Sequence, residues 1–321
     1  MRCSNFTLAG LAFALAPLGL SSLGTSSAEA QSRPAITGIS HIAVYTSDAA
    51  AAEHFYVHDL GLVKAPDPEN PAGVRYYVDS EQFVEVLPLP ANTTYGDRLD
   101  HLGYITASAA QMRLYLKAHN VAVPDSVTRA SNGSEWFDVK DPEGNTVQFV
   151  QAAVHRVAVA EAGPVGHRII HVGMAVHDRE KEDAFYRGIL GFRPYWYGGM
   201  HADQTDWVSQ QVPDGHDWLE YMLSMGPTGK DLPLKKVESS WGMVNHFSIG
   251  VVNMEKSFAT LHAGDRLNNE HSGMQIGRDG KWQFNLFDPD ETRVELMEYS
   301  NVEKPCCSSF TASNPSPSGQ P

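Results

Sequence analysis

The sequence of 321 residues has only three cysteines, at positions 3, 306 and 307. A small scaffold stapled by disulfides needs several spaced cysteines, so that class of secreted protein is excluded. The adjacent Cys306 and Cys307 could form a vicinal disulfide or be two unpaired residues of a tail. The fold must therefore rest on a hydrophobic core, for which a hydrophobic content of 42% is sufficient.

Basic residues are also scarce. The chain has 24 Lys and Arg against 38 Asp and Glu, which gives a formal net charge of −14. This balance argues against sequence-independent binding of nucleic acid, because such binding depends on neutralising phosphates. It argues equally against an anionic membrane surface as partner. The acidic balance alone does not name a substrate.

One long apolar run, Phe6–Leu23, lies close to the N-terminus, with Arg2 before it and the small-residue pattern Ala28–Ala30 after it. Pro17 and Gly19 interrupt the run, and no stop-transfer pattern follows. These features predict a cleaved signal peptide over residues 1–30, and hence a periplasmic or secreted protein of a bacterium-like cell. A retained N-terminal membrane anchor is the alternative.

The other end of the chain, residues 301–321, is rich in Ser, Pro and Gly. This composition predicts a disordered tail.

Between these ends, the chain contains a fourfold internal repeat. Each copy begins with a strand-like segment that carries a histidine near its start, and a helical pattern follows. Asp48 and Asp178 stand where helix N-caps are expected. In the first and third copies, a glycine follows the helix and leads into a strand. The first-strand histidines are His41, His101, His171 and His246.

Each copy ends in a strand with a polar residue at a matching position. These residues are Glu85, Gln148, Glu220 and Glu295, and they follow the histidine of their own copy by 44, 47, 49 and 49 positions. Because alternate residues of a strand share a face, each of these polar residues points away from its apolar neighbours, such as Val294 and Leu296 beside Glu295. The apolar face should pack on helices, and the polar residues should line a covered cup. Small residues flank the histidines on the cup face: Ala43, Gly103, Gly173 and Ser248.

The predicted fold is therefore α+β, with four βαβββ modules. We place a first domain of two modules at 36–153, a linker at 154–167 and a second domain of two modules at 168–300.

The repeat resembles the vicinal oxygen chelate superfamily, which includes glyoxalase I, the extradiol dioxygenases and the bleomycin resistance proteins. The resemblance runs from Ile39 to Tyr299 and rests on the four modules and on the segments FYRGILGF at Phe185 and FDPDETRVELMEY at Phe287. It implies paired modules whose sheets curl into cups. Modules one and two would pair, and three and four, or the pairs would be crossed as in some fused glyoxalases.

The resemblance also implies metal ligands on the first and last strands of paired modules. Carried over, the second half supplies His171, Glu220, His246 and Glu295, a complete set like that of bacterial glyoxalase I. The first half supplies the weaker set His41, Glu85, His101 and Gln148, in which a neutral amide replaces one carboxylate. We therefore expect one divalent ion, Fe, Mn, Ni or Zn, with a second ion if the first set also binds.

Two enzymatic chemistries and one binding function fit these residues. Glyoxalase-like isomerase or lyase chemistry uses the four-residue set, with Glu295 or Glu220 as the base. Against this chemistry, the glutathione adduct on which glyoxalase I acts is a cytosolic substrate, whereas the predicted signal peptide indicates export. Extradiol ring cleavage uses His171, His246 and Glu295, although Glu220 is then an extra ligand and Asn285 stands where that pattern commonly has Tyr. The third function is metal-free sequestration of a small ligand, as in the bleomycin-binding members.

Overall fold

The computed structural model describes Met1 and residues 32–93, 98–153, 156–160, 163–223, 244–267 and 271–318. The predicted signal peptide, residues 1–30, lies outside the described residues except for Met1. Among the described residues, no helix has the length and apolar character needed to cross a membrane.

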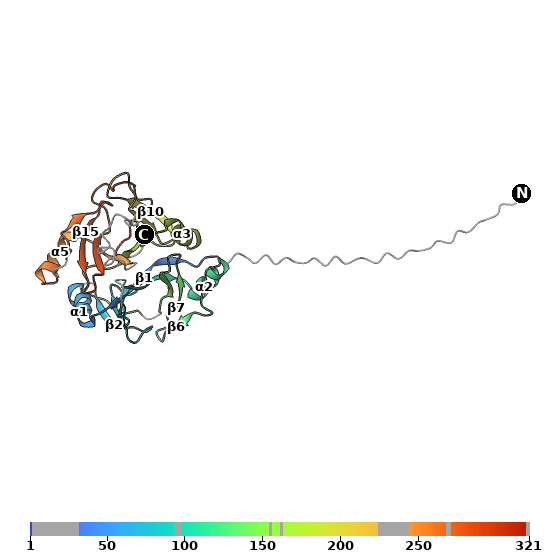
Figure 1. The fold of residues 1–321 in the computed structure, drawn as a ribbon, viewed down its shortest axis with the longest axis horizontal. Coiled ribbons are helices and arrows are strands. Elements are labelled where there is room, and N and C mark those ends of the chain that lie inside the picture. The colour runs from blue at the N-terminus through green and yellow to red at the C-terminus, as the bar shows by residue number, and fades with distance from the viewer. Residues whose placement is uncertain are drawn as a thin grey trace. The chain divides into compact units, whose positions relative to one another are not determined.

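The first half of the chain forms one eight-stranded sheet in the order β2-β3-β4-β1-β5-β8-β7-β6. It contains the two predicted βαβββ modules in sequence (Figure 1). Its elements are β1 (Ile36–Thr46), α1 (Ala49–Glu53), η1 (His54–Asp59), β2 (Val63–Pro66), β3 (Val74–Tyr77), β4 (Phe83–Pro88), β5 (Leu99–Thr106), α2 (Ala109–Ala118), β6 (Thr128–Arg129), β7 (Glu135–Lys140) and β8 (Thr146–Gln151).

The second half repeats this arrangement in the order β10-β11-β12-β9-β13-β16-β15-β14. Modules one and two thus share a sheet, as do modules three and four, and the crossed pairing is excluded. The elements are β9 (Ile169–Ala175), α3 (Arg179–Asp183), η2 (Ala184–Ile189), β10 (Arg193–Gly198), β11 (Trp207–Gln211), β12 (Trp218–Met222), β13 (Val244–Val251), α5 (Met254–Ala263), β14 (Gln275–Ile276), β15 (Trp282–Phe287) and β16 (Arg293–Glu298).

Local sequence signals explain how the first helices of each half begin and end. The Asp48 carboxylate accepts from the backbone N–H groups of Ala50 and Ala51, and Asp178 accepts from Lys181, so both predicted caps are confirmed. Each of these helices continues as one turn of π-helix, η1 or η2. The chain then turns at Gly61 or Gly191, whose φ angles of 73° and 79° suit glycine.

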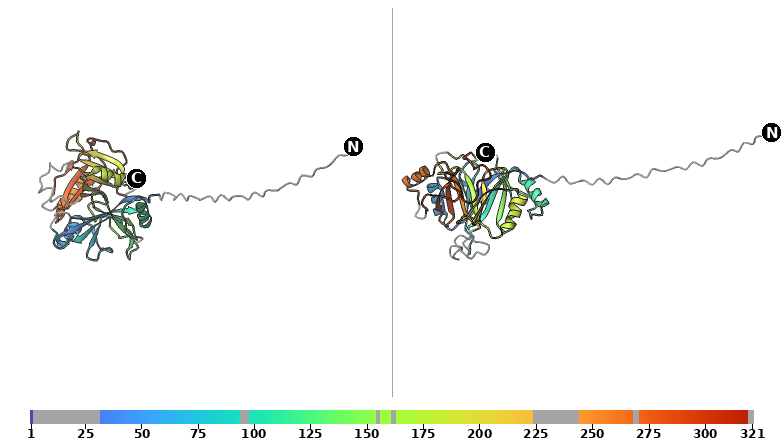
Figure 2. Two further views of the ribbon diagram at one scale, coloured as in Figure 1. Left: turned by 45° about the vertical axis from the view of Figure 1, so that its right-hand side comes forward. Right: turned by 90° about the horizontal axis from the view of Figure 1, so that it is seen from above.

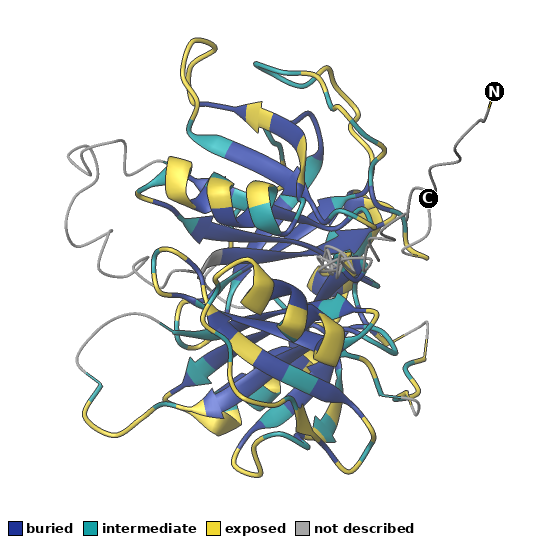
Figure 3. Cartoon of the chain, turned by 90° about the vertical axis from the view of Figure 1, so that its right-hand side faces the viewer, coloured by how far each residue is buried: buried dark blue, intermediate teal, exposed yellow. Residues whose placement is uncertain are grey.

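As predicted, one face of each sheet packs against helices and the other carries the histidines and their polar partners. The apolar residues of the closing strands, such as Val84 and Leu296, belong to one hydrophobic core together with helix residues such as Met112 and Leu261. Figure 3 shows the helices exposing one side to solvent while the strands beneath them are buried. The opposite face of the first sheet carries His41, Glu85, His101 and Gln148, and we call it the first cup. The matching face of the second sheet carries His171, Glu220, His246 and Glu295 and is the second cup.

Buried polar groups join the two sheets where β1 meets β9. The side-chain amide of Gln82 donates to the carbonyls of Ile39 and Ile169, at 2.9 and 3.0 Å. Asp217, which occupies the matching position before β12, accepts from Ile39 N at 2.9 Å and forms a two-pronged ion pair with Arg168 at 2.7 Å. The two halves seen in Figure 2 are thus joined by specific hydrogen bonds as well as by the shared core.

The turns that precede the closing strands reach across to the other sheet. Asp290 accepts from the Thr46 hydroxyl and from Ser47 N, just before α1. In the same way, Glu143 accepts from the backbone N–H groups of His177 and Asp178, just before α3. The turn of the FDPDET segment and the matching turn at Asp141–Glu143 therefore each bind the start of the first helix of the opposite sheet.

Replacing Asp217 with Ala should destabilise the fold strongly. Arg168 is buried, and removal of Asp217, its ion-pair partner, leaves a buried charge, which costs about 3–5 kcal/mol of unfolding free energy. Urea denaturation measures this loss. The control is Glu53→Ala, which removes an exposed ion pair with Lys64 and should cost no more than ~1 kcal/mol. Equal losses in the two variants would refute the role given to Asp217.

Candidate metal centre

The second cup brings two histidines together because β9 and β13 run antiparallel, with His171 opposite Ser248 and His246 opposite Gly173. The Nε2 atoms of His171 and His246 lie 2.8 Å apart. The His246 ring lies directly over Gly173, where any Cβ atom would overlap it. The small residue expected beside the histidine is thus required by the ring's position.

The closing strand β16 adds a carboxylate to this pair. Glu295 Oε2 lies 3.2 Å from His171 Nε2 and 3.9 Å from His246 Nε2. Its side chain is 4% exposed, and Oε2 makes no well-aligned hydrogen bond with any described residue. Donor atoms bound to one ion at ~2.1 Å stand about 3 Å apart, so these three atoms fit a shared divalent metal.

Glu220, on β12, is the fourth predicted ligand and lies just outside the tight group of His171, His246 and Glu295. Its Oε2 atom is 3.6 Å from His246 Nε2, while its Oε1 atom accepts a hydrogen bond from the Ser209 hydroxyl at 3.1 Å. The structure therefore assembles all four predicted residues, with His171, His246 and Glu295 as the tightest group.

The four residues open into a cavity of about 180 Å³. Arg278, Arg293, Asp279 and Gln283 are among its polar lining residues, and Met222, Met297 and five aromatic residues form the apolar part of the wall. The aromatic residues of the wall are Tyr195, Trp196, Trp207, Trp218 and Phe310. Core packing is the default expectation for aromatic residues in a strand, such as Tyr195 and Trp196. In the structure both residues also line the cavity.

The segment after β16 forms part of this wall, which corrects the prediction of a disordered tail for the described residues 301–318. Thr311 N donates to the carbonyl of Tyr195, and Trp196 Nε1 donates to the carbonyl of Cys306. Phe310 packs on Tyr195 with ring centroids 4.9 Å apart. Cys306 and Cys307 form a vicinal disulfide in this segment. Composition predicted disorder because it does not register these long-range contacts.

An aromatic ring and a buried cation support the first histidine. The Trp218 indole stacks on His171 with centroids 4.5 Å apart, and Lys281 Nζ lies 4.6 Å from the Trp218 ring centroid. Burial lowers the pKa of Lys281 to about 8, although Asp279, Glu295 and Glu220 oppose this shift. The lysine thus places positive charge behind the stacked rings.

Burial also sets the protonation of the ligand atoms. It lowers the pKa values of His171 and His246, with Arg293 adding to the effect at His246, so both rings are neutral near pH 7. Burial and the Glu295 charge raise the pKa of Glu220 to about 8. The site therefore combines neutral imidazoles suited to metal binding with one carboxyl group that holds a proton near neutrality.

Arg293 Nη2 lies 2.6 Å from His246 Nδ1, so that nitrogen accepts and the ring proton resides on Nε2. Metal binding through Nε2 requires the proton on Nδ1 instead. A metal bound through His246 Nε2 would therefore require Arg293 to release Nδ1.

A family model described as the Glyoxalase/Bleomycin resistance protein/Dioxygenase superfamily matches residues 38–149 and 168–296, more than half of the chain. The chain belongs to this superfamily. This confirms the resemblance drawn from the modules and the two quoted segments.

Among curated proteins, this superfamily member is similar to an iron-dependent extradiol dioxygenase of Rhodococcus jostii (strain RHA1), with 28% identity over 176 residues. The match covers 49% of this chain and 55% of that protein, so it spans about half the length of the relative.

Solved structures show the same fold. The 2,3-dioxygenase LapB from Pseudomonas sp. KL28 has a TM-score of 0.61 at 15% identity, covering 90% of this chain and 97% of that one. The Mn(II)-bound glyoxalase from Novosphingobium aromaticivorans has a TM-score of 0.59 at 15% identity, covering 85% of each chain. At these identities, the likeness establishes the α+β fold of paired modules alone.

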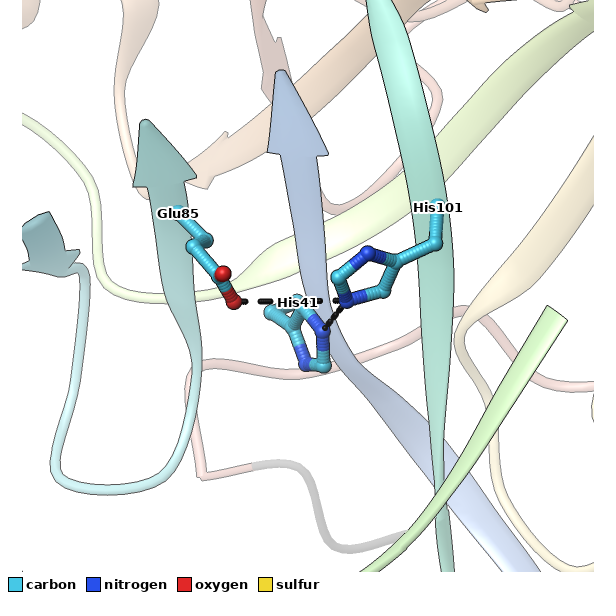
Figure 4. Close-up of side chains that lie close together, drawn as sticks. All are labelled: His41, Glu85 and His101. Atoms are coloured by element: carbon cyan, nitrogen blue, oxygen red, sulfur yellow. Dashed lines mark hydrogen bonds and ion pairs between the residues drawn. The ribbon is translucent and has the colours of Figure 1, made fainter. Parts of the chain in front are cut away.

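The first cup also assembles its predicted histidines and glutamate (Figure 4). His41 Nε2 and His101 Nε2 lie 2.7 Å apart, and Glu85 Oε2 is 4.0 Å from His101 Nε2. Gln148 is buried as well, but its amide donates to Glu69 at 3.0 Å. A cavity of about 420 Å³ on this sheet is lined by Arg75 and Phe83, and none of the four predicted ligands is in its wall.

Sequence reasoning missed several residues of the second cup. Ser209 could have been found, since alternation along β11 puts it opposite Glu220. Lys281 and Phe310 carry no local signal, because only the tertiary fold brings them to Trp218 and Tyr195.

Glu295→Gln should weaken divalent metal binding by more than about 100-fold, since changes in outer-shell residues alone cost 10–100-fold. Elemental analysis after reconstitution and dialysis measures the bound metal. Glu85→Gln is the matched control in the first cup and should leave the metal content of the chain unchanged. Unchanged metal content in Glu295→Gln would show that Glu295 is not a ligand.

Metal affinity should rise with pH up to about 8, because the ion favours the ionised form of Glu220, whose pKa is raised to about 8. Below that value, the expected slope approaches tenfold per pH unit, with one proton released. Calorimetric titration in buffers of different ionisation enthalpy counts that proton. Glu220→Gln should flatten the dependence, and an unchanged slope in that variant would assign the proton to another group.

Proposed function

We propose that this protein is an iron-dependent, extradiol-type dioxygenase that cleaves the ring of a small aromatic vicinal diol. The observation that carries the proposal is that the His171, His246 and Glu295 group opens into a small cavity with aromatic walls.

The ligand group supports this chemistry. Two histidines and one carboxylate on one face, with the remaining positions open, are the arrangement of non-haem iron(II) oxygenases. An iron(II) ion bound there would supply Lewis acidity and the redox chemistry for dioxygen. Ser209 helps to keep the remaining positions open, because its hydroxyl holds one oxygen of Glu220.

The cavity favours a planar substrate of modest size. Its volume of about 180 Å³ is below the ~300–1,000 Å³ of pockets for drug-sized ligands, so a single substituted ring is the expected guest. Indole and phenol rings of the wall can stack on such a ring. Arg278 and Arg293 favour a guest that becomes anionic when it loses a hydroxyl proton.

Glu220 is the residue we assign as proton acceptor for that hydroxyl group. It lines the cavity beside His246. Its pKa of about 8 lies close to the range where a general base works best, and a bound ion would favour the ionised form that accepts the proton. The Rhodococcus relative, named as an iron-dependent extradiol dioxygenase, adds support at the level of reaction class.

A glyoxalase-like isomerase is the second candidate. The observation in its favour is that Glu220 Oε2 lies 3.6 Å from His246 Nε2, within reach of a four-ligand centre. Asn285, which pairs with Glu295 across β15 and β16, also departs from the extradiol pattern. The narrow aromatic cavity favours ring cleavage over this alternative.

We also propose that the enzyme acts outside the cytoplasm. The support is the sequence of residues 1–30, with its basic start, apolar run and Ala28–Ala30 cleavage pattern.

Oxygen uptake with a panel of catechols, measured on the iron-loaded protein, tests the function. We expect one dioxygen consumed per ring cleaved. Glu220→Gln should retain iron but lose about 10²–10⁴-fold in kcat, as expected for removal of a general base. Conversion of 2-oxoaldehyde thiol adducts without oxygen uptake would favour the isomerase. Absence of bound metal after reconstitution would leave metal-free ligand sequestration as the function.

A further inference from the structure

The two cups differ at one strand position that faces a glutamate. In the first sheet, Arg75 on β3 pairs in register with Glu85 on β4. In the second sheet, Ser209 on β11 pairs in register with Glu220 on β12. The same place in the repeat therefore holds a large cation in one cup and a small neutral residue in the other.

Arg75 is held firmly at this place. Its guanidinium is 4% exposed and bonds to Asp67 at 3.0 Å and to Glu69 at 2.6 Å, and its Nη2 lies 3.8 Å from Glu85 Oε2. The carboxylate that a metal would need from the first cup thus already has a cation beside it. Asp67 and Glu69 are engaged by the same group.

The arginine also separates the ligand set from the cavity. Its Cζ lies 4.1 Å from the centroid of the Phe83 ring, which stacks on His41 at 4.6 Å and lies 5.1 Å from the Tyr77 ring. Arg75 and Phe83 are in the wall of the 420 Å³ cavity, whereas His41 and Glu85 are not. In the second cup, Ser209 lies in the cavity wall together with His171 and Glu220.

In other respects, the first cup has the side-chain orientations expected of a metal site. His101 Nδ1 donates to Asp100 at 2.6 Å, and His41 Nδ1 lies 3.0 Å from the Ser40 hydroxyl, which leaves the two Nε2 atoms facing each other. Such outer contacts orient histidines that bind metals. Glu85 Oε2 is buried and makes no well-aligned hydrogen bond with a described residue.

We propose that Arg75 closes the first cup to divalent metal, by its charge and by covering the ligand set, and that Ser209 leaves the second cup open. The residue at this position then determines how many ions the chain holds. The inference rests on the proposed function in taking the second cup as the loaded site.

Reciprocal substitution tests the proposal, with Mn²⁺ or Zn²⁺ alone as the probe and bound equivalents as the readout. The wild type should hold one equivalent and Arg75→Ser two. Adding Glu85→Gln to Arg75→Ser should return the value to one. Arg75→Lys, which keeps the charge, should stay at one.

The converse change is Ser209→Arg, which should weaken binding at least about 100-fold, the order expected for a like charge within ~6 Å at an effective dielectric constant of about 20. Val252→Arg adds the same charge at an exposed position outside the cavity wall, so it is the control and should bind as the wild type does. If Arg75→Ser fails to fold by circular dichroism, this pair decides the question.

Two results would overturn the role of Arg75: a folded Arg75→Ser variant with one equivalent, or a wild-type chain with two. A folded Ser209→Arg variant that binds as tightly as the wild type would overturn it too. A wild-type chain with no metal would instead overturn the proposed function.

Discussion

The antiparallel pairing of β9 with β13 is the constraint on which the rest of the second cup depends. Each strand starts its own module and carries one histidine, so neither module alone can make the centre. Once the strands pair, the two Nε2 atoms stand 2.8 Å apart, and the parallel partners β12 and β16 deliver Glu220 and Glu295 from either side. A slip of one residue would turn the side chains of a strand to the opposite face.

The two sheets have the same topology, but different residues surround the histidines in their cups. Both cups stack an aromatic ring on the first histidine and a cation on that ring: Phe83 with Arg75 in the first, Trp218 with Lys281 in the second. In the first cup the cation also lies 3.8 Å from the ligand carboxylate of Glu85, whereas in the second the contact of Lys281 is with the indole, at 4.6 Å from its centroid. A duplicated fold can thus keep one open centre and one closed one without changing its topology.

Much of the fold could be predicted because strand periodicity and helix caps depend on short segments of sequence. The caps at Asp48 and Asp178, the turns at Gly61 and Gly191, the four modules and the polar faces all follow from residues close together in sequence. The crossed alternative for module pairing could not be excluded in this way, because the four first strands are similar. The prediction of disorder after β16 was wrong for 301–318, since the contacts of Phe310 and Thr311 are with β10, more than a hundred residues earlier.

The sequence by itself determined which residues could bind a metal, because ligand type, strand face and spacing are local properties that repeat in four copies. It could not determine which cup is open. That difference depends on where Arg75 and Ser209 lie relative to the ligands, and on a wall that includes Phe310, whose ring contacts the buried Lys281. The contacts of Phe310 with Tyr195 and of Lys281 with Trp218 join residues far apart in the chain, and only the packed tertiary structure brings them within reach of one another.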